Sequence, residues 1–189
     1  MKTKTIFILL FISYLGYSQD TDSINTSKVV SSTQKITFTQ FDLTIPFKGN
    51  KKRGETFADG STNDNWFIPD GVGAKFGYGL HHNKWIGVSV NSGIDFYASY
   101  KLIALPVFTN FRISPKIGQE TRITAQYGLG QSFAIGRGNL QGSYQKASIG
   151  LENGDGICLF IEGNYHGYTV GNYLDKVYNF SIGICLFNF

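Results

Sequence analysis

GVGAKFGYGL, the stretch Gly71–Leu80, alternates strictly between apolar residues and small or polar ones. Neighbouring side chains of a strand face opposite sides of the sheet, so this stretch predicts a strand with one apolar face. The opposite face holds Lys75 among four glycines. Such a strand suits a soluble sheet with one buried face, and it suits equally a membrane barrel whose apolar face meets lipid.

The same alternation recurs along the chain and predicts an all-β fold of eight strands. We expect strands at 35–47, 71–80, 85–95, 102–113, 121–131, 145–152, 157–168 and 177–189. A break in the alternation near Gln40 predicts a β-bulge in the first strand. A second break, between Leu186 and Phe187, leaves open which of these two side chains faces outward. Asn153-Gly154-Asp155-Gly156 is typical of a hairpin turn.

The connections between these strands are expected to alternate in length. Long ones are predicted at 48–70, 96–101, 132–144 and 169–176, and short ones at 81–84, 114–120 and 153–156. Successive connections of an up-and-down barrel lie at opposite rims, and outer-membrane barrels have long outer loops and short periplasmic turns. The pattern therefore predicts an eight-stranded antiparallel up-and-down transmembrane β-barrel over residues 34–189.

The N-terminus is typical of an export signal. Lys2 and Lys4 precede a short apolar run, and small residues at 16 and 18 suit cleavage by a signal peptidase. We expect a signal peptide at 1–18 and a flexible periplasmic lead-in at 19–33; an uncleaved anchor is the alternative. The formal net charge of +4 falls to +2 without the two lysines, which is too small to indicate nucleic-acid binding.

The position of the glycines favours a membrane barrel over a soluble, lipocalin-like barrel that binds an apolar ligand. The alternation alone fits both, because either face can line the inside. Glycines gather on the polar face of several strands, and small residues suit the cramped interior of an eight-stranded barrel. The last strand ends at the aromatic Phe189 and so resembles the terminal signal of substrates of the barrel assembly machinery.

Four stretches together resemble a known family. They are the signal end Tyr17-Ser18-Gln19, the strand LPVFTNFR at 105–112, the glycine-rich YGLG at 127–130, and the terminal Phe189. The chain resembles, over most of its mature length, the small outer-membrane β-barrel family of Bacteroidetes known as the PorT-like group. The resemblance implies the barrel fold and a location in the cell outer membrane. It supplies no catalytic residues.

Charged residues on the polar face form the first candidate site. In a closed barrel they meet in the lumen, where an unpaired charge is costly. The expected luminal network consists of Asp42, Lys75, Asp95, Arg112, Arg122, Lys146 and Glu162. This network is either a gated polar pathway or a salt-bridged plug, and the narrow lumen of eight strands favours the plug.

Two further sets of residues are candidates. Cys158 and Cys185 are expected near the periplasmic rim on neighbouring strands, as a disulfide or as packed thiols. A basic run at the outer rim is either a solvated surface or a contact for lipopolysaccharide phosphates or acidic polymer: Lys48, Lys51, Lys52 and Arg53. An interfacial aromatic girdle is expected at the same rim from Trp66, Phe67, Phe96, Tyr97, Tyr100, Tyr168 and Tyr173.

No catalytic or metal site is predicted. His81 and His82 are neighbours that point apart, His166 belongs to the opposite rim, and no set of ligands has the spacing of a zinc site. No Ser, His and Asp pattern indicates a triad. We expect a non-enzymatic protein without a cofactor, structural or surface-binding through its extracellular loops. The alternatives are a soluble lipocalin-like barrel and an outer-membrane enzyme acting on lipid or peptide.

Overall fold

The computed structural model describes residues 36–136, 140–169 and 176–189, which belong to one compact unit spanning Gln34–Phe189. The expected signal peptide and lead-in lie outside the described residues. The strands are β1 (Thr37–Gly49), β2 (Phe67–Pro69), β3 (Gly71–His82), β4 (Ile86–Tyr97), β5 (Leu102–Ile113), β6 (Arg122–Ile135), β7 (Gln141–Glu152), β8 (Ile157–Thr169) and β9 (Lys176–Asn188). In this part of the chain no helix is long and apolar enough to cross a membrane.

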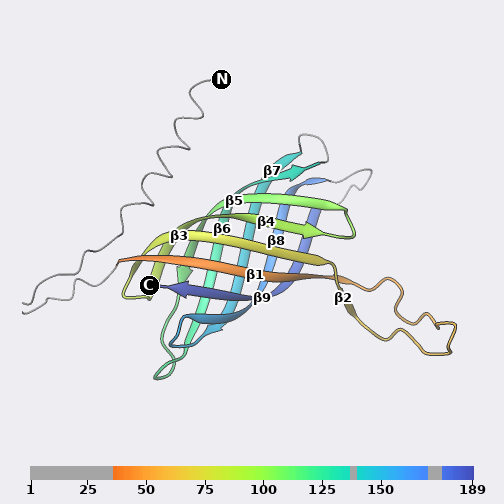
Figure 1. Cartoon of the computed structure of the whole chain (residues 1–189), viewed down its shortest axis with the longest axis horizontal. Coiled ribbons are helices and arrows are strands. Elements are labelled where there is room, and N and C mark those ends of the chain that lie inside the picture. Colours follow the sequence, from red (N-terminus) through yellow and green to blue (C-terminus); the bar gives the residue numbers. More distant parts are fainter. Residues whose placement is uncertain (1–35, 137–139, 170–175) are drawn as a thin grey trace, which may run out of the picture. The chain divides into compact units, whose positions relative to one another are not determined.

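Eight of these strands close into an antiparallel barrel (Figure 1). Each long strand pairs with its neighbour in the chain, and β1 closes the ring by pairing with β9 from Thr39 opposite Asn188 to Phe47 opposite Phe180. The predicted eight-stranded antiparallel barrel is therefore confirmed. The short β2 was not predicted; it pairs with the end of β1 and forms a hairpin that extends beyond the other strands (Figure 1).

Outward-facing and inward-facing side chains alternate along every long strand. On β3, Phe76 and Tyr78 are more than half exposed, whereas Lys75, directly before Phe76, is 2% exposed. The same phase holds elsewhere, and large apolar side chains point outward from all eight barrel strands, including Leu43, Val90, Phe111, Leu129, Ile149, Leu159 and Ile184. The interior is built largely of polar side chains and glycine, the reverse of an ordinary soluble core.

The two breaks in the sequence alternation come from inward-facing aromatic residues. β1 pairs with β3 without interruption from Thr37 opposite Leu80 to Thr44 opposite Gly73, so the predicted bulge near Gln40 is wrong. Phe38 points inward and is buried, which places an apolar residue on the polar phase. At the other chain end Phe187 is buried in the same way and Leu186 faces outward.

The predicted alternation of connection lengths is wrong. Strand pairing continues through segments that were expected to be loops, so only residues 98–101 separate β4 from β5 and only 136–140 separate β6 from β7. The connection 114–121 at the other rim is longer than either. Glycine and serine in the expected loop still pair as strand residues, as Ser132 does opposite Gly142. Among the connections inside the described ranges, only 50–66 is long.

Two rims follow from this topology. We call the end that carries the β1–β2 hairpin, the connection 98–101 and the end of β6 the hairpin rim. The turn rim is the opposite end, with the connections 83–85, 114–121 and 153–156 and the chain end at Phe189.

Glycines on the inner face of β3 make room for side chains of β4. A Cβ added to Gly77 would lie 1.9 Å from Oδ1 of Asn91, and one added to Gly73 would lie 2.2 Å from Oδ1 of Asp95. Contacts this short are not tolerated between real atoms. These β4 side chains therefore lie across the β3 backbone, and this packing explains Gly73 and Gly77 in the opening stretch.

Candidate functional site

Five buried charged residues form one network across the barrel interior. The Lys75 ammonium lies 2.7 Å from a Glu162 carboxylate oxygen and 3.3 Å from Asp95. Lys146 lies 2.7 Å from the other Glu162 oxygen and 3.0 Å from Asp42. The five side chains come from five different strands, so the network ties opposite walls of the barrel together.

The charges of this network do not balance. Its carboxyl groups are Asp42, Asp95 and Glu162, and its ammonium groups are Lys75 and Lys146. Glu162 contacts both lysines, whereas Asp95 contacts only Lys75, and its Oδ2 has no hydrogen-bond partner among the described residues. Asp95 is thus the carboxyl group in surplus.

Arg112 belongs to a separate group near the turn rim. Its guanidinium contacts Glu152, whose Oε2 also accepts hydrogen bonds from the Ser114 and Thr124 hydroxyls at 3.1 and 2.9 Å. Arg122 is half-buried and donates to the carbonyls of Ser114 and Lys84. Of the seven predicted residues, five are therefore brought together, Arg112 is paired elsewhere, and Arg122 lies at the rim.

Glu152 is a partner that the sequence reasoning missed. It has the same strand phase as Lys146, which places both side chains inside the barrel. This phase could have predicted that Glu152 points inward. Glu152 stands directly before the predicted turn, however, where a charged residue is normally solvated.

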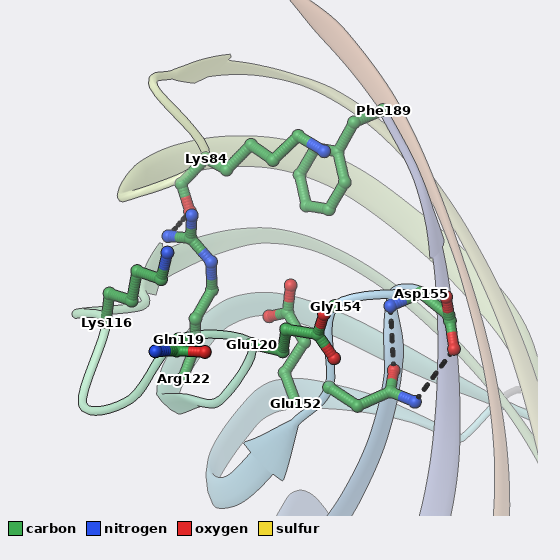
Figure 2. A pocket seen from close by; sticks show the side chains of 10 residues that line it. Lys84, Lys116, Gln119, Glu120, Arg122, Glu152, Gly154, Asp155 and Phe189 are labelled. Atoms are coloured by element: carbon green, nitrogen blue, oxygen red, sulfur yellow. Dashed lines mark hydrogen bonds between the residues drawn. The ribbon is translucent and has the colours of Figure 1, made fainter.

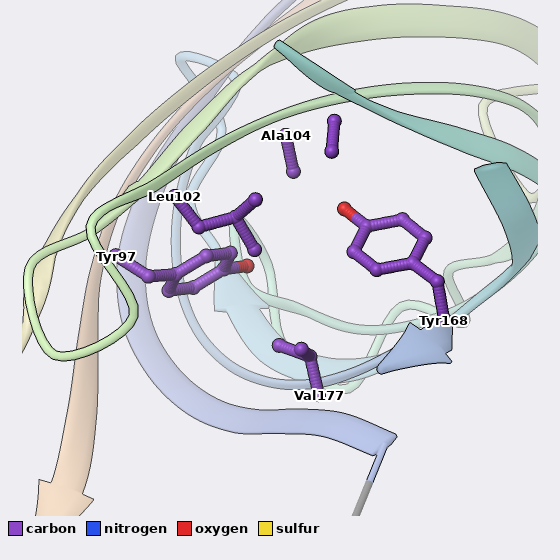
Figure 3. Close-up of a cluster of buried hydrophobic side chains, with 6 residues drawn as sticks. Tyr97, Leu102, Ala104, Tyr168 and Val177 are labelled. Atoms are coloured by element: carbon purple, nitrogen blue, oxygen red, sulfur yellow. The ribbon is translucent and has the colours of Figure 1, made fainter. Parts of the chain in front are cut away.

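Apolar side chains close the barrel at the hairpin rim. Figure 3 shows Tyr97, Leu102, Ala104, Tyr168 and Val177 converging in the interior, where they form one buried cluster with Ala134. Tyr97 and Tyr168 were expected in an outward aromatic girdle, and this prediction is wrong because both rings point inward. Trp66, Phe67 and Phe96 are exposed, Tyr100 is half-buried, and Tyr173 lies outside the described residues.

A second apolar cluster lies toward the turn rim. Its buried members are Phe38, Cys158, Phe160, Cys185 and Phe187, with Phe189 packed against them. The Phe38 and Phe189 rings are stacked with centroids 5.7 Å apart. The charged network thus lies between two buried apolar clusters.

The two cysteines lie directly opposite each other in the register of β8 and β9. Both thiols are fully buried and free. The structure thus places them on neighbouring antiparallel strands inside the second cluster, without a covalent bond.

A buried chain of hydrogen bonds contains a serine and a histidine that the sequence did not connect. His166 Nδ1 lies 2.8 Å from Ser132 Oγ, and its Nε2 lies 3.1 Å from the Tyr97 hydroxyl. A Ser-His-Asp triad needs a carboxylate on the second histidine nitrogen and an open nucleophile. Here a tyrosine takes that position, and Ser132 and His166 are both fully buried. The chain satisfies buried polar groups and offers a substrate no access.

A small pocket at the turn rim has mixed charge (Figure 2). It has a volume of about 360 Å³, and Lys84, Lys116 and Arg122 line it together with Glu120 and Asp155. Because cations and acids are interleaved, the pocket does not favour a ligand of one charge.

A larger groove of about 1260 Å³ lies at the base of the β1–β2 hairpin. All four residues of the predicted basic run line it, together with aromatic residues of the hairpin and of β9: Phe47, Trp66, Phe67, Tyr178 and Phe180. Lys48 pairs with Asp70 at 3.0 Å, and the Arg53 guanidinium lies 3.3 Å from the centre of the Trp66 ring. We call this the hairpin-base groove.

The histidines do not form a metal site. His81 is buried at the end of β3, where its Nδ1 accepts a hydrogen bond from the Lys84 backbone at 3.1 Å and its ring packs on Phe189. Across the described ranges, no three His, Cys, Asp or Glu side chains are placed to hold a metal ion.

A scan of the chain against protein-family models gave no match, and a search of curated protein sequences gave none.

Proposed function

We propose that this protein is a non-enzymatic outer-membrane β-barrel with a closed lumen, which acts as a membrane-embedded scaffold and binds at the cell surface through its hairpin rim. The observation that carries the proposal is the inverted polarity of the barrel. Burying apolar surface contributes about 25 cal/mol per Å², so a band of exposed Leu, Ile, Val and Phe around every wall is unfavourable in water. A lipid environment removes that cost.

The geometry of the strands supports the same proposal. The barrel strands are 12–14 residues long, and a tilted strand needs about 9–11 residues to cross a bilayer. A lipocalin-like barrel needs an apolar cavity for its ligand, whereas this interior holds Lys75, Lys146 and Glu162. The export signal and the resemblance to the PorT-like group are further parts of this proposal. In it the hairpin rim faces the cell surface and the turn rim faces the periplasm.

The proposal that the barrel neither catalyses a reaction nor conducts solutes has one physical reason. Catalysis and conduction both need a path for solutes, and the interior groups lie behind the apolar clusters at either end. A closed interior favours a function in which the rims of the barrel bind other molecules.

Cell fractionation tests the proposal. The full chain, expressed with its own N-terminus, is expected in the outer-membrane fraction, requiring detergent for extraction and migrating faster on a gel before boiling than after it. Purified protein in a planar bilayer is expected to give no step conductance. Recovery in a soluble fraction without detergent would refute the membrane assignment, and discrete conductance steps would refute the closed lumen.

A further inference from the structure

We propose that the hairpin-base groove binds a lipid with a phosphorylated headgroup, held by Lys51 and Lys52 at the headgroup and by Phe47 and Phe180 along the hydrocarbon chain. The inference rests on the proposed function, because the hydrocarbon chain reaches the groove only if the barrel wall beside it lies in a bilayer.

The cations of the groove differ in the contacts that they already make within the protein. Lys48 is paired with Asp70 and also contacts the Ser99 hydroxyl. The Arg53 guanidinium is stacked on Trp66, which fixes its plane and leaves its N–H edge available. Lys51 and Lys52 are exposed beside them. These groups together present a positive surface suited to phosphate oxygens.

The acids of the hairpin are kept away from this surface. Glu55, Asp59 and Asp64 do not line the groove, and Asp70, which does, is paired with Lys48. In the lining of the groove the four cations Lys48, Lys51, Lys52 and Arg53 therefore outnumber the single acid, Asp70.

The floor of the groove is apolar and continuous with the outer wall of the barrel. Phe47 and Phe180 are directly opposite each other in the β1–β9 register, and Tyr178 beside them is 64% exposed. The same outward face of β9 continues through Ile182 and Ile184. A phosphate alone would leave the aromatic floor uncovered, and an uncharged lipid would leave the lysines without a partner. An anionic lipid matches both parts.

Tryptophan fluorescence tests the inference in the full-length protein. The chain has two tryptophans, and Trp85→Phe leaves Trp66 in the groove as the reporter. The protein is inserted into phosphatidylcholine vesicles that contain brominated phosphatidic acid or, separately, brominated phosphatidylcholine. We expect stronger quenching of Trp66 by the phosphatidic acid. The double variant K51Q/K52Q is expected to lower this preference by about fivefold for each lysine removed. The matched control K116Q, at the turn rim, is expected to keep the preference.

The outcomes separate this inference from the proposed function. Equal quenching by the two lipids in a barrel that has inserted would overturn the inference and leave the membrane assignment standing. Retention of the preference in K51Q/K52Q would overturn the assigned lysines. Displacement of the brominated phosphatidic acid by inorganic phosphate would show a site for free anions and overturn the lipid assignment. Failure of the protein to insert would instead refute the proposed function.

Discussion

Glu162 contacts both Lys75 and Lys146 and so joins the two halves of the buried network. A buried charge that loses its partner is costly, because the surrounding medium cannot solvate it. Asp95 has a different position, since its partner Lys75 keeps Glu162 when Asp95 is changed. The two carboxyl groups are therefore expected to differ in their contribution to stability.

We expect Glu162→Gln to lower the free energy of unfolding by about 1.5–3 kcal/mol, because both lysines lose a charged contact, although Lys75 keeps Asp95 and Lys146 keeps Asp42. Asp95→Asn, the matched variant, is expected to change it by less than about 1 kcal/mol, because it removes the surplus charge and keeps the shape. Reversible urea unfolding of the refolded barrel measures both values. Equal losses in the two variants would contradict the assigned roles.

Packing around Gly77 gives a second prediction. Gly77→Ala places a Cβ against the Asn91 amide and is expected to cost about 1–3 kcal/mol by overpacking. Asn91→Ala removes that amide, whose polar atoms have no hydrogen-bond partner among the described residues. The double variant is therefore expected to be more stable than Gly77→Ala alone in the same unfolding experiment. If Asn91→Ala gives no recovery, the strain of Gly77→Ala has another source.

At the scale of elements, β8 and β9 are joined by backbone pairing with the two cysteines opposite each other. Both thiols face the buried aromatic cluster toward the turn rim. Packing inside this cluster, rather than a covalent link, then holds the ends of the two strands together.

We expect both cysteines to remain free thiols in protein purified without reductant. Denatured protein is expected to react with two equivalents of maleimide, and the folded barrel is expected to react much more slowly because both sulfurs are buried. Mass spectrometry of the alkylated protein, with and without prior reduction, counts the reactive thiols. Alkylation that occurs only after reduction would show a disulfide between Cys158 and Cys185.

On the scale of the whole molecule, polarity is inverted around a closed ring of strands. The outer wall is apolar, and the charged groups of the network contact one another in the interior. The outer part of the β1–β2 hairpin extends beyond the ring of eight strands and is the largest extension in the described part of the chain (Figure 1).

An arginine placed on the outer wall tests this inversion. Leu129→Arg, in the middle of β6, is expected to destabilise the barrel in a bilayer by about 2–4 kcal/mol, because the charge meets hydrocarbon. Leu151→Arg, at the turn-rim end of β7, is expected to cost about 0–1 kcal/mol, because its side chain reaches the headgroup region. Unfolding in lipid vesicles measures both values. Similar small effects at both positions would contradict a wall that faces lipid.

Alternation with a period of two is a local property of a strand, and for that reason the sequence was sufficient to predict the eight strands and the two faces of each. The glycines indicated which face lies inside, and this predicted the inward charges except Glu152. The termini of strands carry no such local signal. Glycine and serine at 132–144 looked like a loop, and their pairing depends on a neighbouring strand that is distant in the chain.

Only the tertiary structure decided which inward residues meet. The closed ring brings Lys75 beside Glu162, 87 residues apart, and separates Arg112 and Arg122 from their network. It also placed Tyr97 and Tyr168 in a buried interior cluster and gathered the basic run with β9 aromatics into one groove. Each of these outcomes depends on register and closure around the ring, whereas the face of each strand is set by its own residues.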